Sequence, residues 1–133
     1  MPDPRVGFTA NWSQRHVAYA AGLGTFGLSD GLITEAGVAQ AVGTVVVNIP
    51  FDSPKRPGDI HAACLYYQKG ACMACAKRCP AGAISERGHD KNACAKFAFS
   101  QTPLNKERYG IETYSCGLCL TGVPCSRGNP VKG

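Results

Sequence analysis

Apolar residues in the first fifty positions change from helical spacing to short runs typical of strands. Residues 17–21 carry small apolar residues at helical spacing behind Ser13, whose side chain suits an N-cap, and Gly22 would end this helix. The short run at residues 32–34 and the valine-rich run at residues 42–49 are both typical of β-strands. The N-terminal part therefore predicts one helix followed by a short β-sheet.

The second half of the chain predicts short helices separated by glycine and proline. We expect them at residues 60–68 and 74–79, from a cap at Asp90 or Asn92 to Ser100, and as a short turn at residues 105–108. Helices and strands that are segregated along the chain indicate the α+β fold class.

The chain has 133 residues, a length typical of one compact domain. A turn-rich stretch at residues 52–59 divides it into residues 1–54 and residues 55–133. The first part has two Arg and four acidic residues, a net charge of −2. The second has 12 Lys and Arg against five acidic residues, a net charge of +7, and it contains all 8 Cys.

Composition excludes several classes of partner. No apolar run approaches the ~20 residues of a membrane span, and the first residues lack the pattern of a signal peptide. We therefore expect a cytoplasmic protein with no membrane partner. Aromatic residues make up only 8%, and no basic stripe is interleaved with them, which argues against nucleic acid as a partner.

Three cysteines form a run that is typical of iron–sulfur proteins. Cys72, Cys75 and Cys79 are spaced C-x2-C-x3-C and followed by Pro80, which matches the last three positions of the bacterial ferredoxin run C-x2-C-x2-C-x3-C-P. Lys69 stands where the first cysteine of that run is expected, and Cys64 is the free candidate to replace it. In the ferredoxin run the cysteine before proline binds the other cluster.

This crossed arrangement divides the eight cysteines into two sets of four. The first cysteine set is Cys64, Cys72, Cys75 and Cys125, and the second cysteine set is Cys79, Cys94, Cys116 and Cys119. The sequence thus predicts a two-cluster, bacterial ferredoxin-like core behind the N-terminal helix and sheet. Structural zinc also suits paired C-x2-C motifs but does not account for the Cys-Pro run. A disulfide framework lacks an export signal to go with it.

Residues 64–126 resemble the double 4Fe–4S module of epoxyqueuosine reductases and corrinoid-dependent reductive dehalogenases, in which a lone Cys precedes Cys-x2-Cys and a final Cys. Residues 21–34 (AGLGTFGLSDGLIT) are similar to the glycine-rich stretch before the clusters in those enzymes. The resemblance implies an upstream domain that builds most of the corrinoid and substrate site. We expect that domain to be missing or on a separate chain, and we do not expect cobalamin to bind this chain alone.

Other candidate residues receive structural interpretations. His61 lies near Cys64, but eight thiols suffice as ligands, so we expect a hydrogen-bonding role; for Arg15, His16 and Tyr19 we expect a structural role. Gly22, Gly24 and Gly27 match a dinucleotide-binding pattern, but the predicted helix precedes them, so we reject nucleotide binding. The lysines and arginines near the cysteines offset the negative charge of the clusters.

Two functional hypotheses remain. The first is an electron-transfer protein with two 4Fe–4S clusters that serves a redox partner protein. The second is the electron-supplying portion of a corrinoid-dependent reductase of the family named above. In either case we expect a redox module with no catalytic residue of its own, whose residues 60–128 depend on the metal for folding.

Overall fold

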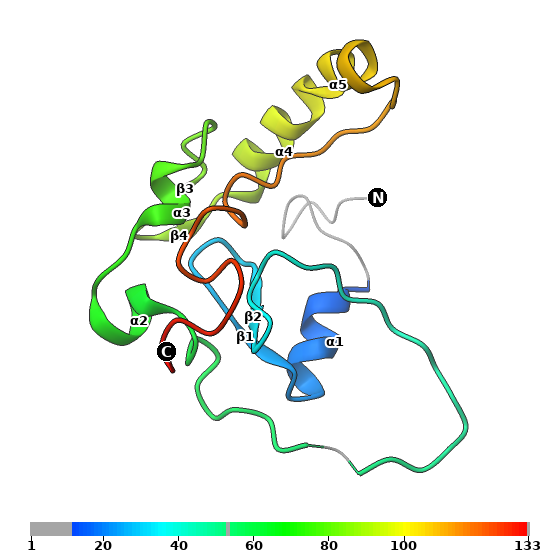
Figure 1. Cartoon of the computed structure of the whole chain (residues 1–133), viewed down its shortest axis with the longest axis vertical. Helices are drawn as coiled ribbons and strands as arrows, with labels where there is room; N and C mark the ends of the chain where they lie inside the picture. Colours follow the sequence, from blue (N-terminus) through cyan, green and yellow to red (C-terminus); the bar gives the residue numbers. More distant parts are fainter. Residues whose placement is uncertain (1–11, 53, 133) are drawn as a thin grey trace.

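The computed structural model of the chain describes residues 12–52 and 54–132. The expectation about a signal peptide, and Ser53 in the turn-rich stretch, lie outside these residues. The elements follow in the order α1 (Gln14–Ala20), β1 (Gly24–Phe26), β2 (Leu32–Thr34), α2 (Leu65–Lys69), α3 (Ala74–Lys77), β3 (Ile84–Ser85), β4 (Gly88–His89), α4 (Lys91–Ser100) and α5 (Thr102–Tyr109), as Figure 1 shows. Helices and two small antiparallel sheets make this an α+β protein, as predicted.

Helix α1 and the hairpin β1–β2 pack together in the N-terminal part. The Ser13 side chain caps α1 by accepting a hydrogen bond from the backbone N–H of His16, as predicted. Strand β1 pairs antiparallel with β2, placing Phe26 opposite Leu32. These two side chains and Ala18 form a small buried cluster. Strand β2 lies where a strand was predicted, whereas β1 was not predicted.

A larger core joins the N-terminal part to the cysteine-rich part. Its buried members are Leu28, Ile33, Val38, Ala63, Cys64, Ile84 and Val123. Backbone hydrogen bonds connect the same parts: Phe26 N donates to Ile60 O at 2.7 Å, and Val38 N donates to Cys125 O at 2.8 Å. Gly37 has a φ of +93°, and a Cβ there would collide with the backbone of Ser126. The C-terminal turns are therefore held directly against the loop that follows β2.

Two helices of the cysteine-rich part begin or end differently from the prediction. Helix α2 begins at Leu65, with Cys64 as its extended N-cap, and ends at Gly70, which adopts a left-handed conformation. The predicted start at residue 60 is wrong because residues 60–63 form turns. Helix α5 is longer than the short turn predicted at residues 105–108. Pro103 lies in its first turn, where a missing N–H is tolerated.

The prediction is closer for α3 and α4. Helix α3 is a single turn that ends before Pro80, as expected from the sequence. Asp90 caps α4 by accepting hydrogen bonds from the backbone N–H groups of Asn92 and Ala93. The two-residue hairpin of β3 and β4, with Ile84 opposite His89, was not predicted. No helix in the described part of the chain is long and apolar enough to cross a bilayer.

The predicted strand at residues 42–49 is wrong. This segment belongs to a long loop that leaves the body of the molecule after β2 and returns to it before α2 (Figure 1). Val45 and Val46 are 83% and 88% exposed. A strand needs a neighbouring strand to take its backbone hydrogen bonds, and neither described hairpin pairs with this segment. Valine content alone is therefore not enough to predict a strand at residues 42–49.

Candidate metal centres

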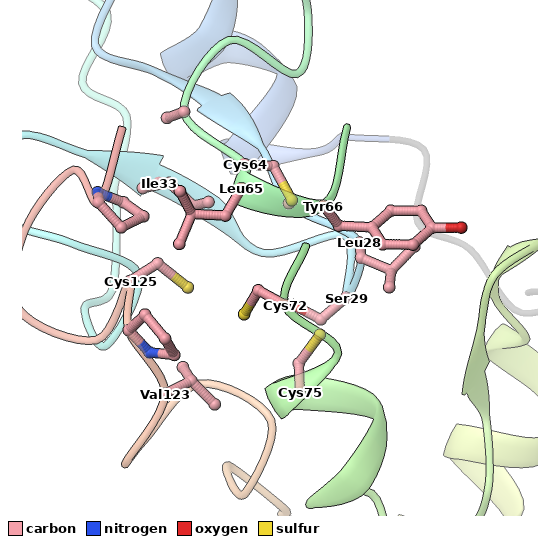
Figure 2. A pocket seen from close by; sticks show the side chains of 14 residues that line it. Leu28, Ser29, Ile33, Cys64, Leu65, Tyr66, Cys72, Cys75, Val123 and Cys125 are labelled. Atoms are coloured by element: carbon pink, nitrogen blue, oxygen red, sulfur yellow. The ribbon is translucent and has the colours of Figure 1, made fainter. Parts of the chain in front are cut away.

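The first cysteine set lines one cavity. Cys64 caps α2, Cys72 follows that helix, Cys75 lies on α3, and Cys125 belongs to the C-terminal turns. Figure 2 shows the sulfur atoms of Cys64, Cys75 and Cys125 directed toward a common space, with Cys72 between them. The structure thus brings together, from sites up to 61 positions apart in the chain, the four residues that the ferredoxin spacing assigns to one cluster.

The walls of this first cavity are mainly apolar. Leu28, Ile33 and Val123 come from the large core, and Tyr66 and Ser29 complete the lining together with several small residues. The space between the walls, including the part that opens to solvent, measures about 380 Å³. Buried apolar walls keep water away from the thiols and lower the local dielectric constant.

The second cysteine set lines a separate cavity. Cys79 follows α3, Cys94 lies on α4, and Cys116 and Cys119 lie in the loop after α5. The other residues that line this cavity are Pro80, Ala81, Ile84, His89 and Phe97. Its space, again including the open part, measures about 330 Å³. Of the eight cysteines only Cys116, which lines the second cavity, is exposed.

The end of α3 explains why neighbouring cysteines serve different cavities. Residues four positions apart share a face of an α-helix, so Cys75 and Cys79 would point the same way in a continuous helix. Helix α3 ends at Lys77, however, and Pro80 cannot continue it. Cys79 therefore turns toward the second cavity, where its sulfur accepts a hydrogen bond from Ala83 N at 3.3 Å.

Backbone strain accompanies the first cysteine set. Cys72 has a φ of +81°, a conformation that residues with a Cβ rarely adopt. Such strain persists only where the surrounding structure enforces it, and it concentrates at functional sites. Cys72 lies two residues after Gly70 and is the first cysteine of the C-x2-C motif. The chain must turn sharply there to bring the thiols of Cys72 and Cys75 to one cavity.

Burial raises the pKa of four of the thiols. In the first cavity, burial and the neighbouring thiols of its own set raise the pKa of Cys125 to about 11, and burial likewise raises the pKa of Cys75. In the second cavity, burial followed by Cys116 and Cys94 raises the pKa of Cys119 to about 11, and burial raises the pKa of Cys94. Thiols like these lose their protons readily only when a cation binds them.

The electrostatic influence between thiols stays within each set. The thiols that raise the pKa of Cys125 are Cys75, Cys64 and Cys72, all of the first set. Those that raise the pKa of Cys119 are Cys116, Cys94 and Cys79, all of the second set. Proximity of the thiols therefore divides the eight cysteines in the same way as the two cavities do.

The histidine, arginine, tyrosine and lysine side chains that the sequence analysis discussed individually lie outside both linings. His61 Nδ1 lies 2.8 Å from Phe26 O, and its ring stacks on Tyr67 at 3.9 Å, which agrees with the expected hydrogen-bonding role. His16 contacts Ser13, and Arg15 donates to Asp30 O at 2.7 Å. Tyr19 packs against Phe26, and Lys69 is an exposed residue at the end of α2.

Sequence reasoning missed one polar residue of the second cavity. His89 lies in β4, its side chain is 13% exposed, and its Nδ1 is 3.3 Å from Oδ2 of Asp30, 59 positions earlier in the chain. The hydrogen bond from His89 is the main reason why the pKa of Asp30 is lowered. The only local signal was the position of His89 beside the cap of the helix that carries Cys94, which is too weak to indicate a cavity.

The donor chemistry of both cavities fits thiolate-binding metal groups. All eight cysteines are free thiols. Among the described residues, no group of three or more His, Cys, Asp or Glu side chains forms a site for a single metal ion. Four sulfur donors around one space are the ligands of iron–sulfur clusters and of structural zinc. Comparisons of the chain with models of protein families, with curated proteins and with solved structures found no match.

Proposed function

We propose that this protein is an electron-transfer module that holds two 4Fe–4S clusters, one in each cavity. The observation that carries the proposal is the division of eight thiols between two separate cavities, four to each, in the sets that the ferredoxin spacing predicts. Spacing and spatial arrangement are independent of one another here, because Cys125 and Cys116 are far from the C-x2-C-x3-C-P run in sequence. The proposal includes a ferredoxin-like two-cluster core.

The residues around each cavity would hold the clusters and exclude water. The bound clusters supply one-electron chemistry, with a potential set by hydrogen bonds to sulfur, burial and local charge. Leu28, Ile33 and Val123 shield the first cysteine set from solvent. In the second cavity, the N–H of Ala83 donates to the Cys79 sulfur. With four thiolates for each cluster, no open coordination position is left for a substrate.

Arg78 ties the two parts of the second site together. Its Nε donates to Leu118 O at 2.9 Å, across 40 positions of sequence, and Leu118 lies between Cys116 and Cys119. The guanidinium group therefore holds the C-x2-C loop against the end of α3, where Cys79 lies. It also brings a positive charge close to thiolates that carry negative charge when metal is bound. Arg78, one of the basic residues behind the positive net charge of residues 55–133, thus has a structural role.

Iron and sulfide analysis of anaerobically purified protein tests the proposal. We expect about eight irons per chain, absorption near ~400 nm, and electron paramagnetic resonance of two reduced clusters after dithionite treatment. About four irons would mean that one cavity does not hold a cluster. Zinc without sulfide would overturn the proposal. Lys69→Ser is the matched control, because this residue lies beside the cysteine run but lines neither cavity.

A second candidate function is the electron-supplying portion of a corrinoid-dependent reductase of the epoxyqueuosine reductase or reductive dehalogenase type. The observation in its favour is the position of the glycine-rich stretch that carries the resemblance. Gly27, Leu28, Ser29 and Ile33 of this stretch line the first cavity, so it is built into the redox site. Cobalamin titration under anaerobic conditions tests this candidate. A change in the cobalamin spectrum supports it, and an unchanged spectrum leaves the simple electron carrier.

A further inference from the structure

The turn between β1 and β2 reaches both cavities. Leu28 and Ser29 of this turn line the first cavity, and the next residue, Asp30, contacts His89 of the second. Asp30 has a φ of +56°, and the N–H of Asp30 donates to Gly27 O at 3.0 Å, which closes the turn. Arg15 of α1 fixes the turn from the other side by donating to Asp30 O. The turn therefore holds the Asp30 side chain rigidly against His89.

Apart from the cysteines, two titratable side chains line the cavities. Tyr66 lines the first, and His89, whose side chain is 13% exposed, lines the second. The Tyr66 hydroxyl of the first cavity makes only a long contact, 3.5 Å, with Glu86 O, and the remaining lining of both cavities is apolar or small. With Nδ1 facing the Asp30 carboxylate, the imidazole of His89 is oriented by this partner. Lys91 Nζ lies 4.0 Å from the same carboxylate and adds positive charge on this side.

We propose that His89, held by Asp30, raises the reduction potential of the cluster in the second cavity, so that an electron shared by the two clusters rests there. This inference depends on the proposed function. A ring N–H beside a cluster would stabilise the additional negative charge of the reduced form, whereas the apolar lining of the first cavity would not. The exposed edge at Cys116 favours the reduced form at the second cavity for the same reason.

The step itself moves one electron. The first cysteine set would hold the cluster that gives up the electron and the second cysteine set the cluster that receives it, and no bond would form or break. His89 is a positioning residue in this step, because it acts on the potential through space and ligates nothing. Electrons would leave the molecule from the second cavity, since its exposed edge lets a partner approach the thiol of Cys116.

Replacing His89 with phenylalanine tests the proposal. A redox titration monitored by electron paramagnetic resonance should give two potentials in the unaltered protein. His89→Phe should lower the higher potential and leave the lower one unchanged, with about a tenfold shift in the electron distribution between the clusters, or about 59 mV for a one-electron couple. His89→Gln keeps an N–H donor and should restore most of the difference. His16→Phe, at an exposed histidine away from both cavities, is the control.

The outcomes separate this inference from the proposed function. If the unaltered protein contains no iron–sulfur clusters, both fall. If two clusters are present and His89→Phe changes neither potential, or lowers only the lower one, the inference alone is overturned. If His89→Phe fails to load the second cluster, the smaller His89→Leu takes its place beside His89→Gln. A higher potential that falls in His89→Leu and is mostly retained in His89→Gln supports the inference, and a higher potential that is the same in both variants overturns it.

Discussion

The two cavities hold the same number of thiols in very different surroundings. The first cavity lies against the large core, whose members Leu28, Ile33 and Val123 are all less than 8% exposed. The second cavity lies against α4, which has no buried residue, and beside the exposed Cys116. Equal donor sets therefore do not mean equal sites. The large core supplies five lining residues to the first cavity and one to the second: Leu28, Ile33, Ala63, Cys64 and Val123 for the first, and Ile84 for the second.

The N-terminal part accounts for most of this difference. The hairpin β1–β2 and its turn contribute Gly27, Leu28, Ser29 and Ile33 to the first cavity. On the side of the second cavity, Asp30 contacts His89 and lies 4.0 Å from Lys91 Nζ of α4. Figure 1 shows α4 and α5 extending away from the hairpin and the large core. We call each cavity with its four cysteines a half-site, and we predict that without metal the first half-site keeps more of its walls than the second.

Metal removal should produce the largest effect and should be uneven along the chain. Helices α4 and α5 bury no residue, so without a cluster at Cys94 little holds them in place. In the metal-free protein we expect amide hydrogen exchange over residues 90–119 to approach that of an unfolded chain, while β1 and β2 stay protected. Exchange measured by mass spectrometry with and without an iron chelator checks this. Uniform loss of protection would contradict the difference between the half-sites.

Single cysteine substitutions should separate the two sites. Cys94→Ser removes a ligand of the second set, and Cys125→Ser removes one of the first. Each variant should retain about four of about eight irons, because the cavities share no thiol. The remaining electron paramagnetic resonance signal should differ between the two variants. Loss of both clusters in Cys94→Ser would show that the sites assemble as one unit.

The two cavities divide the cysteines as the sequence spacing does, whereas most of the residues around those cysteines were not predicted. The direction of Cys79 could be predicted from neighbouring residues alone, because a helix that must stop before Pro80 turns the cysteine after it away from the face of Cys75. The caps at Ser13 and Asp90 are local in the same way. The strand at residues 42–49 failed because strand formation needs a partner elsewhere, and valine content does not supply one.

The role of His89 could not be read from the sequence for a related reason. Its partner Asp30 lies 59 positions away, and only the packed β1–β2 turn brings the two together. The apolar lining of the first cavity likewise combines Ile33 with Val123, which no local pattern connects. Contacts between distant segments depend on the whole fold, whereas caps, breaks and ligand spacings do not.

Wall substitutions should have an intermediate effect. Ile33 is 2% exposed and lines the first cavity, so Ile33→Ala should lower the free energy of unfolding by about 2–5 kcal/mol. Phe97, which lines the second cavity, is only half-buried, so Phe97→Ala should have a smaller effect. Anaerobic urea unfolding of the metal-loaded protein measures both. An equal or larger loss in Phe97→Ala would contradict the view that the second cavity has little protein core behind it.

The smallest effect should be a pH dependence of the stability of the metal-free protein. The pKa values of Cys119 and Cys125 are both raised to about 11 from an ordinary value of 9.0. Between these values the unfolded metal-free chain releases protons that the folded chain retains, so the stability of the folded form should fall as the pH rises from about 9 to about 11. Both thiols are only half-buried, so solvent screening reduces the effect.

Thiol-to-alanine variants show which cysteines cause this decline. In the metal-free protein, Cys125→Ala should reduce the loss of stability between pH 9 and 11, as measured by urea unfolding of the β1–β2 core. Cys119→Ala should change it only if the second half-site stays folded without metal, because a pKa shift affects stability only where the folded environment persists. A measurable effect of Cys119→Ala would therefore argue against metal-dependent folding of residues 90–119. No effect of Cys119→Ala beside a clear effect of Cys125→Ala would show, independently of hydrogen exchange, that only the first half-site stays folded without metal.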